Sequence, residues 1–284
     1  MSRPIDVMQL GMDRIICAWE ADGVIVDPGP ESRLETLLEA LEGEAPRALL
    51  LTHIHLDHAG AAGALVRRFP DLEVYVHERG APHLVDPEKL VNSATQLYGD
   101  EMELLWGEVL PVPEENLRVL TGGETVLGFR VEYTPGHASH HVSYLHEATG
   151  EAYVGDVAGV RIPPADFTAP PTPPPDIDLE AWMRSLDLLS EWSPSALCLT
   201  HFGRVDDVDA HLLRMREGIA RRGENARIHG GEAFMAGVEA EIDAIDEPEV
   251  AERFRRAAPT DQMWLGLERY WRKKAERDEA VSAS

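Results

Sequence analysis

The chain has 284 residues and carries 51 acidic against 26 basic side chains, so its formal net charge at pH 7 is −25. This charge disfavours unaided binding to nucleic acid or to an anionic membrane, because phosphate contacts require clustered lysine and arginine. The sequence has neither a run of about eighteen apolar residues nor a signal-peptide pattern near its start, so we expect a cytoplasmic protein. Cys17 and Cys198 form no CxxC pair, and we expect both to be reduced and buried.

The first part of the chain alternates short apolar runs with amphipathic segments, which predicts strands alternating with helices. One segment has Ser32 and Glu35 in capping-box spacing, followed by leucines on one helical face. The expected elements here are strands near 5–10, 14–19 and 23–27, a helix near 32–43, a strand over 47–52, a helix near 59–69 and a strand over 73–77.

The next part predicts a second half-sheet, two inserted segments and a helical C-terminal region. The insert 83–116 has apolar residues at helical spacing, whereas 161–177 is rich in proline and must be an extended, stiff loop. That loop is either a wall of the functional pocket or a linker without substrate contact. Strands are expected near 117–120, 125–134, 142–146, 152–155 and 196–200, a helix from Asp178, and helices over 204–284 with disorder over 280–284.

The segment Thr52-His53-Ile54-His55-Leu56-Asp57-His58-Ala59-Gly60 is the most informative part of the sequence. It follows the apolar run 47–51, which predicts a buried strand that ends at a site. In extended backbone His53 and His55 face the same side. The small residues after His58 allow the chain to turn into a helix, so one short segment can serve two metal ions.

Three further candidate ligands follow later predicted strands. His137 comes after the run 129–133 in a Thr-Pro-Gly-His turn, Asp156 ends the segment 153–156, and His201 closes the segment 196–201. Each residue alone is more typical of a turn or of a hydrogen-bonded polar group. Their joint appearance after apolar strands makes them candidate ligands.

Together these motifs resemble the metallo-β-lactamase superfamily over residues 5 to about 203, including an early strand that ends in an aspartate-bearing turn at 23–29. The resemblance implies an α/β fold, the αββα metallo-β-lactamase sandwich, with an added C-terminal helical subdomain. We expect a catalytic domain over 1–203 and a helical subdomain over 204–284 that serves substrate selection or homodimer formation. By resemblance, one metal ion is held by His53, His55 and His137, a second by Asp57, His58 and His201, and Asp156 bridges them.

The resemblance also implies the chemistry. Two divalent ions, zinc with iron or manganese as alternatives, would activate a bridging water as hydroxide. Asp57 would be both a ligand and the catalytic residue that orients this hydroxide and carries a proton to the leaving group. Neighbouring polar side chains should orient the imidazoles, with His141 in such a role and the role of His140 left open. Thr52, Thr134 and Thr200 are placed beside ligands in the sequence.

The expected function is hydrolysis of a small carboxyl-derived substrate, namely a thioester, ester or lactone. Asp156 argues against β-lactam hydrolysis, because the true β-lactamases of the superfamily lack the bridging aspartate. The charge and the lack of an added nucleic-acid-binding domain argue against a nuclease, and 204–284 is too short for the flavin domain of flavodiiron proteins. A mononuclear iron dioxygenase for persulfides, a phosphodiesterase of the same fold, and a non-catalytic binding protein remain as alternatives.

Overall fold

The computed structural model describes residues 2–282, which form two six-stranded sheets. The first sheet has the order β1-β2-β3-β4-β5-β6 and the second β12-β11-β10-β9-β8-β7. The first comprises β1 (Arg3–Asp6), β2 (Cys17–Ala21), β3 (Val24–Val26), β4 (Ala48–Leu50), β5 (Val74–His77) and β6 (Leu117–Leu120). The second comprises β7 (Thr125–Val126), β8 (Phe129–Tyr133), β9 (Val142–His146), β10 (Glu151–Tyr153), β11 (Ala196–Leu199) and β12 (Gly203–Val205).

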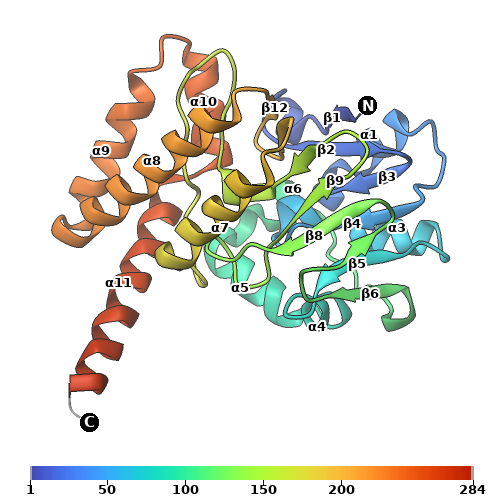
Figure 1. Cartoon of the computed structure of the whole chain (residues 1–284), viewed down its shortest axis with the longest axis horizontal. Coiled ribbons are helices and arrows are strands. Elements are labelled where there is room, and N and C mark those ends of the chain that lie inside the picture. The colour runs from blue at the N-terminus through green and yellow to red at the C-terminus, as the bar shows by residue number, and fades with distance from the viewer. Residues whose placement is uncertain (1, 283–284) are drawn as a thin grey trace.

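Helices cover the outer faces of both sheets, so the expected αββα arrangement is confirmed (Figure 1). The helices of residues 2–282 are α1 (Leu34–Ala40), α2 (Leu56–Ala59), α3 (Ala62–Arg68), α4 (Ala81–Val85), α5 (Glu88–Tyr98), α6 (Met102–Trp106), α7 (Leu179–Trp192), α8 (Val208–Ile228), α9 (Gly231–Asp243), α10 (Pro248–Ala257) and α11 (Thr260–Ser282). Short 3-10 turns span Gln9–Gly11, Glu31–Arg33, Gly99–Glu101, Glu114–Asn116 and Gly155–Ala158. Among residues 2–282, no helix combines the length and the apolar character that crossing a bilayer requires.

The apolar runs in the sequence form central strands, which are buried on both faces. Along β4, Leu50 packs between the two sheets, whereas Leu49 and Leu51 pack under the helices of the outer face. Along β11, Cys198 faces the space between the sheets and Leu197 faces the helices. Successive side chains of a strand point to opposite faces, so each strand supplies two apolar layers.

Several expected elements differ in the structure. The first strand ends at Asp6, whose carboxylate accepts backbone hydrogen bonds from Met8 and Arg14 and so closes a loop. The expected strand over 125–134 is a hairpin, because Leu127 and Gly128 both have positive φ and form a two-residue turn between β7 and β8. The expected capping box is wrong. The hydroxyl of Ser32 donates instead to the carbonyl of Leu105, and helix α1 begins only after the 3-10 turn.

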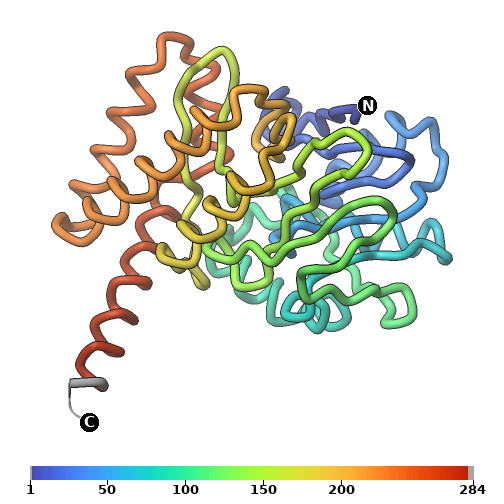
Figure 2. The backbone as a smooth tube through the Cα atoms, in the orientation of Figure 1, coloured from blue at the N-terminus to red at the C-terminus, as the bar shows by residue number. Residues whose placement is uncertain are grey.

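The C-terminal helices share one apolar cluster with the outer face of the second sheet. Helical structure begins at Val208 rather than at 204, because Gly203–Val205 pairs with β11 as the edge strand β12 and buries Val205. Helix α11 extends away from the body of the protein and continues to Ser282 (Figures 1 and 2). The disorder expected over 280–284 is thus replaced by helix as far as Ser282, and residues 283–284 lie outside the described residues.

The two inserted segments agree with their expected character. The insert 83–116 contains α5, α6 and the C-terminal part of α4. The proline-rich stretch 161–177 contains no helix or strand, and Val160 and Ala169 form one isolated bridge beside its start. Figure 2 shows this stretch in yellow-green, running next to the C-terminal helices. Both cysteines are free and buried, as expected.

Candidate metal centre

The fold brings all seven candidate ligands together at the ends of four strands. The chain between β4 and α2 carries the first two histidines, and the first turn of α2 carries an aspartate and a third histidine. The remaining candidates lie in the turn after β8, the 3-10 turn after β10 and the residue pair after β11. These residues are His53, His55, Asp57, His58, His137, Asp156 and His201.

A first triad consists of His53, His55 and His137. Nδ1 of His55 lies 3.0 Å from Nε2 of His53 and 3.0 Å from Nε2 of His137. One nitrogen atom from each residue lies within 4.8 Å of the other two, which is the spacing of atoms that share one metal ion.

A second triad consists of Asp57, His58 and His201, whose donor atoms again lie within 4.8 Å of one another. Oδ2 of Asp57 is 3.2 Å from Nε2 of His201 and 3.7 Å from Nε2 of His58. Both histidines are fully buried, whereas the Asp57 side chain is 22% exposed and therefore reaches the cavity described below.

Asp156 lies between the two triads. Its Oδ2 is 3.4 Å from Nε2 of His137 in the first triad. Its Oδ1 is 3.3 Å from Nε2 of His58 and 3.5 Å from Nε2 of His201 in the second triad. One carboxylate thus presents a different oxygen to each triad, which is compatible with a bridging role.

Backbone and carboxylate acceptors fix the tautomers of three candidate ligands. Nδ1 of His137 donates to the carbonyl of Pro171 at 3.0 Å, and Nδ1 of His201 donates to the carbonyl of Ile15 at 2.7 Å. Nδ1 of His58 is 2.8 Å from a carboxylate oxygen. Because these acceptors cannot donate, each Nδ1 carries a proton, and in the neutral imidazole Nε2 has the lone pair for a metal.

That carboxylate belongs to Asp27, a buried residue at the end of β3 that organises several neighbours. Thr52 and Thr200 donate their hydroxyls to its Oδ2 at 2.7 and 3.1 Å, and the backbone N–H of Thr52 donates to its Oδ1. Since the Thr52 hydroxyl proton is used on Asp27, its oxygen accepts from Nδ1 of His53 at 3.1 Å. His53 therefore also keeps a lone pair on Nε2.

Several of these atoms have no partner within residues 2–282. Nε2 of His58, Nε2 of His201 and Oδ1 of Asp156 are buried and form no hydrogen bond. Burying a polar atom without a partner costs about 1–3 kcal/mol, so three such atoms facing one point indicate a ligand. Imidazole nitrogens and carboxylate oxygens suit divalent transition metals, and the donor set therefore fits metal ions.

The electrostatic environment acts on these residues in opposite directions. Burial acts to lower the pKa of His58 and of His201, but the carboxylates of Asp156 and Asp57 outweigh it and raise both, so a metal ion has to displace a proton at these two imidazoles. Burial lowers the pKa of His55 to about 4, so its imidazole is neutral near neutral pH. Burial acts to raise the pKa of the Asp57 carboxyl, but His58 and His201 outweigh it and hold this pKa at about 2. The same imidazoles outweigh burial at Asp156 and hold the pKa of its carboxyl well below the ordinary value.

Two more histidines, His140 and His141, lie next to the candidate metal centre. Nδ1 of His141 is 2.9 Å from the hydroxyl of Thr134, and its ring stacks on that of His53 with centroids 5.1 Å apart. His141 thus contacts a candidate ligand, and its orienting role stays a prediction. His140 lines the cavity and accepts a hydrogen bond from the backbone of Ile54 at 3.5 Å.

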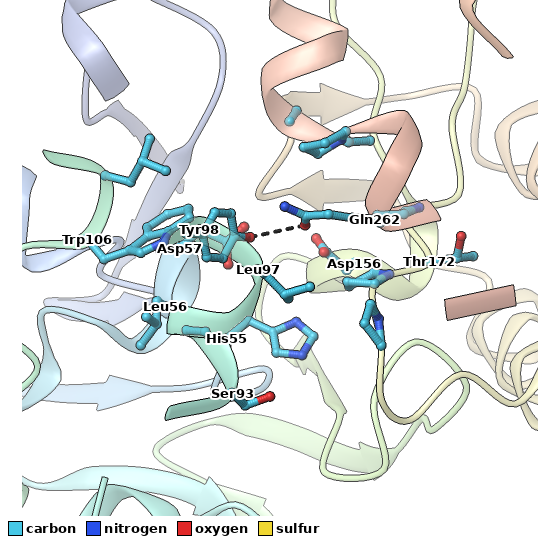
Figure 3. Close-up of a pocket in the computed structure, with 18 of the residues that line it drawn as sticks. His55, Leu56, Asp57, Ser93, Leu97, Tyr98, Trp106, Asp156, Thr172 and Gln262 are labelled. Carbon is cyan, nitrogen blue, oxygen red and sulfur yellow. Dashed lines mark hydrogen bonds between the residues drawn. The ribbon is translucent and has the colours of Figure 1, made fainter. Parts of the chain in front are cut away.

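A cavity of about 670 Å³ opens above the centre, and His55, Asp57, Asp156 and His201 lie in its wall (Figure 3). The insert, the N-terminal loop around 9–16, the proline-rich loop and the C-terminal helices contribute the other walls. The proline-rich loop therefore lines this cavity, and its contact with substrate stays a prediction. Its carbonyl at Pro171 also holds His137.

Sequence reasoning gave no role to several residues that shape this site. Asp27 appeared only as part of a family-like turn, although a carboxylate directly after an apolar strand signals a buried polar group. The carbonyl of Ile15 carries no signal in the sequence, because every residue has one. The hydrogen bond from the Tyr98 hydroxyl to Oε1 of Gln262, at 3.2 Å, joins residues 164 positions apart and could not be anticipated (Figure 3).

Two packed sheets with a histidine and aspartate cluster at the strand ends define the class of αββα proteins with a candidate metal centre. The sequence model of the metallo-beta-lactamase superfamily matches residues 20–201. The chain therefore belongs to the metallo-beta-lactamase superfamily, most of whose members are metal-dependent hydrolases.

Individual relatives agree with this assignment. The metallo-beta-lactamase fold-containing protein ST1585 from Sulfurisphaera tokodaii is 27% identical over 223 residues, which cover 75% of this chain and 81% of that protein. The solved structure of ST1585 superposes with a TM-score of 0.72 at 24% identity and covers 94% of this chain and 97% of its own. The shared fold thus includes the C-terminal helices.

Two further relatives are similar over a smaller part of the chain. The solved structure of TTHA1623 in a di-iron-bound form has a TM-score of 0.51 at 25% identity and covers 74% of this chain and 91% of that one. A hydroxyacylglutathione hydrolase from Enterobacter sp. (strain 638) is 35% identical over 123 residues, which are 43% of this chain and 37% of that protein. The chain thus spans little more than a third of this hydrolase.

Proposed function

We propose that the protein is a dinuclear metal-dependent hydrolase that cleaves a small carboxyl-derived substrate, namely a thioester, an ester or a lactone. The observation that carries this proposal is the pair of donor triads with the two oxygens of Asp156 turned to different triads. The similarity to hydroxyacylglutathione hydrolases, which extends over less than half of this chain, supports a carboxyl-derived substrate.

The proposed ligands divide into two sets. His53, His55 and His137 hold one ion, Asp57, His58 and His201 hold the other, and Asp156 is shared. Zinc is the proposed metal, with iron or manganese as alternatives, because this donor set suits all three. The di-iron form of TTHA1623 supports iron as a serious alternative. The complete second triad favours a dinuclear centre over the mononuclear iron dioxygenase.

The protein side chains have different proposed roles in the reaction. Bound divalent ions would supply a water of lowered pKa and would polarise the substrate carbonyl. Asp57, ionised and facing the cavity, accepts a proton from the attacking water and passes it to the leaving group. Asp27 holds His58 in its metal-binding tautomer. The cavity volume of about 670 Å³ is in the range of small-molecule sites, so the proposed partner is a small molecule.

A substrate panel with metal-loaded protein tests the proposal. The panel contains an acyl-glutathione thioester, an acyl-homoserine lactone, an aryl ester, a phosphodiester and a β-lactam, with bound metal measured in the same samples. We expect two ions per chain and a clear preference for one carbonyl class. Preferential phosphodiester cleavage would replace the carbonyl proposal, and oxygen consumption with one bound iron would replace hydrolysis by dioxygenase chemistry.

A further inference from the structure

One wall of the cavity is an apolar helix face from the insert. Leu90, Ala94 and Leu97 of α5 follow one another at intervals of four and three residues, so they share a face, and all three line the cavity. Leu97 is only partly buried and belongs to none of the apolar clusters formed by residues 2–282. In Figure 3 its side chain lies between His55 and Gln262. Leu97 thus leaves apolar surface open to a ligand.

This apolar wall begins next to the metal centre. Leu56, Ala94 and Trp106 form a small buried cluster of their own, and Leu90 packs against it. Leu56 and Trp106 also line the cavity. Because Leu56 directly precedes Asp57 in the first turn of α2, a substrate group held at the metal centre has this apolar surface immediately beside it.

The opposite wall is mixed. The start of α11 and the residues before it contribute the apolar residues Ala258, Pro259 and Met263 to the cavity, together with charged side chains of α10 and α11, and Figure 3 shows this part of α11 across the cavity from Trp106. The hydrogen bond between Tyr98 and Gln262 joins the two walls. The α5 face is therefore the apolar wall of a cavity whose other side carries charged groups, and the candidate metal centre borders the same cavity.

We infer that the substrate carries an apolar acyl chain of medium length, which lies along the Leu90–Leu97 face of α5 while its carbonyl group sits at the metal centre. This inference rests on the proposed hydrolase function and specifies its substrate class. Each methylene group removed from water strengthens binding about fourfold, so chain length should control the specificity constant.

An ester series tests the inference with metal-loaded protein. The probes are p-nitrophenyl acetate, butyrate and hexanoate. We expect kcat/KM to rise by at least about tenfold from acetate to hexanoate, because four more methylene groups become buried. A specificity constant that stays flat or falls with chain length overturns the inference while leaving hydrolysis itself intact.

Two variants locate the chain-binding surface. Leu97→Asn should lower the hexanoate-to-acetate ratio of kcat/KM by about tenfold, because it places a polar group on the apolar wall. Leu104→Asn is the matched control, since Leu104 lies on the same insert, is 65% exposed and does not line the cavity. An unchanged ratio in Leu97→Asn, or an equal fall in Leu104→Asn, contradicts the assignment.

Binding of decanoate distinguishes the hydrolase proposal from the proposed apolar acyl site. Calorimetry with the metal-loaded protein should show a negative heat-capacity change, and binding should weaken in Leu97→Asn. If no compound of the substrate panel or of the ester series is cleaved but decanoate binds in this Leu97-dependent way, the hydrolase proposal fails and the apolar acyl site stands. If esters of every length are cleaved and decanoate does not bind, the apolar site fails alone.

Discussion

Oδ2 of Asp27 lies 2.8 Å from Nδ1 of His58, and both side chains are buried. Asp27 has a φ of 51°, in the left-handed region that few non-glycine residues adopt. This backbone geometry directs the carboxylate from the end of β3 toward the segment His53–His58. The same carboxylate also accepts hydrogen bonds from Thr52 and Thr200, which directly precede His53 and His201. A single residue thus connects three candidate ligands.

The first prediction concerns Asp27→Asn. The amide is nearly isosteric but offers only one oxygen as an acceptor, so His58 and the two threonines lose part of their orientation. We expect metal affinity to fall by about 10–100-fold, the usual cost of losing such a partner. Competition with a chelator measures this change. Asp71→Asn, an exposed aspartate on the same domain, serves as control and should bind metal as the unmodified protein does.

The second prediction concerns Asp57→Asn. If Asp57 accepts and delivers the proton, turnover of the preferred panel substrate should fall by at least about 100-fold. The fold should be nearly unchanged by circular dichroism, because Asp57 lies at the edge of the cavity rather than in a core. Survival of catalysis, or collapse of the fold, would remove this role from Asp57.

The third prediction compares His137→Ala with His201→Ala. Each variant removes a proposed ligand of a different ion, so metal analysis should find a loss of about one ion per chain in both cases. His229→Ala, an exposed histidine on the C-terminal side of α8, should keep the full metal content. Unchanged stoichiometry in either ligand variant would take that histidine out of the ligand set.

The fourth prediction concerns Gly136→Ala. Gly136 has a φ of 139°, and a Cβ atom there would lie 2.3 Å from Cα of Trp182 in α7. The backbone has to shift, so we expect the free energy of unfolding to fall by about 3 kcal/mol and metal content to fall through the displaced His137. Gly123→Ala is the control, because it also has positive φ but no atom within 4 Å of the added Cβ. Equal losses in both variants would show that the positive φ, and not the clash with Trp182, causes the effect.

The fifth prediction concerns the contact of α11 with α7. Partial burial acts to raise the pKa of Glu180, but hydrogen bonds from Lys274 and Tyr270 outweigh it and hold this pKa at about 2. Since the folded pKa is below the model-peptide value of 4.5, this stabilisation is full above pH 4.5 and is lost as pH falls toward 2.

Urea unfolding of Glu180→Gln at several pH values measures this effect. The Glu180 side chain is 51% exposed, so solvent screening limits the loss near neutral pH to about 1 kcal/mol or less. The difference from the unmodified protein should shrink as pH falls below 4.5. A double-mutant cycle with Lys274→Met isolates the pair, and zero coupling energy would contradict the prediction.

Much of the fold followed from local patterns in the sequence. The run before His53 and the run before His201 were expected to be buried strands, and β4 and β11 confirm them. Buried strands can be predicted from the sequence because both of their faces need apolar residues. The turns were harder to predict from the sequence. The hairpin at Leu127 depends on a leucine in positive φ, which its side chain does not favour.

The sequence by itself determined the superfamily, the main buried strands and the residues that gather at the candidate metal centre, because these depend on short motifs with fixed spacing. Only the tertiary structure decided what surrounds them. The acceptors of His137 and His201 are backbone carbonyls at Pro171 and Ile15, and the cavity walls come from the insert and the C-terminal helices. Such contacts join segments far apart in the chain, and packing of whole helices and loops, rather than any local preference, brings them together.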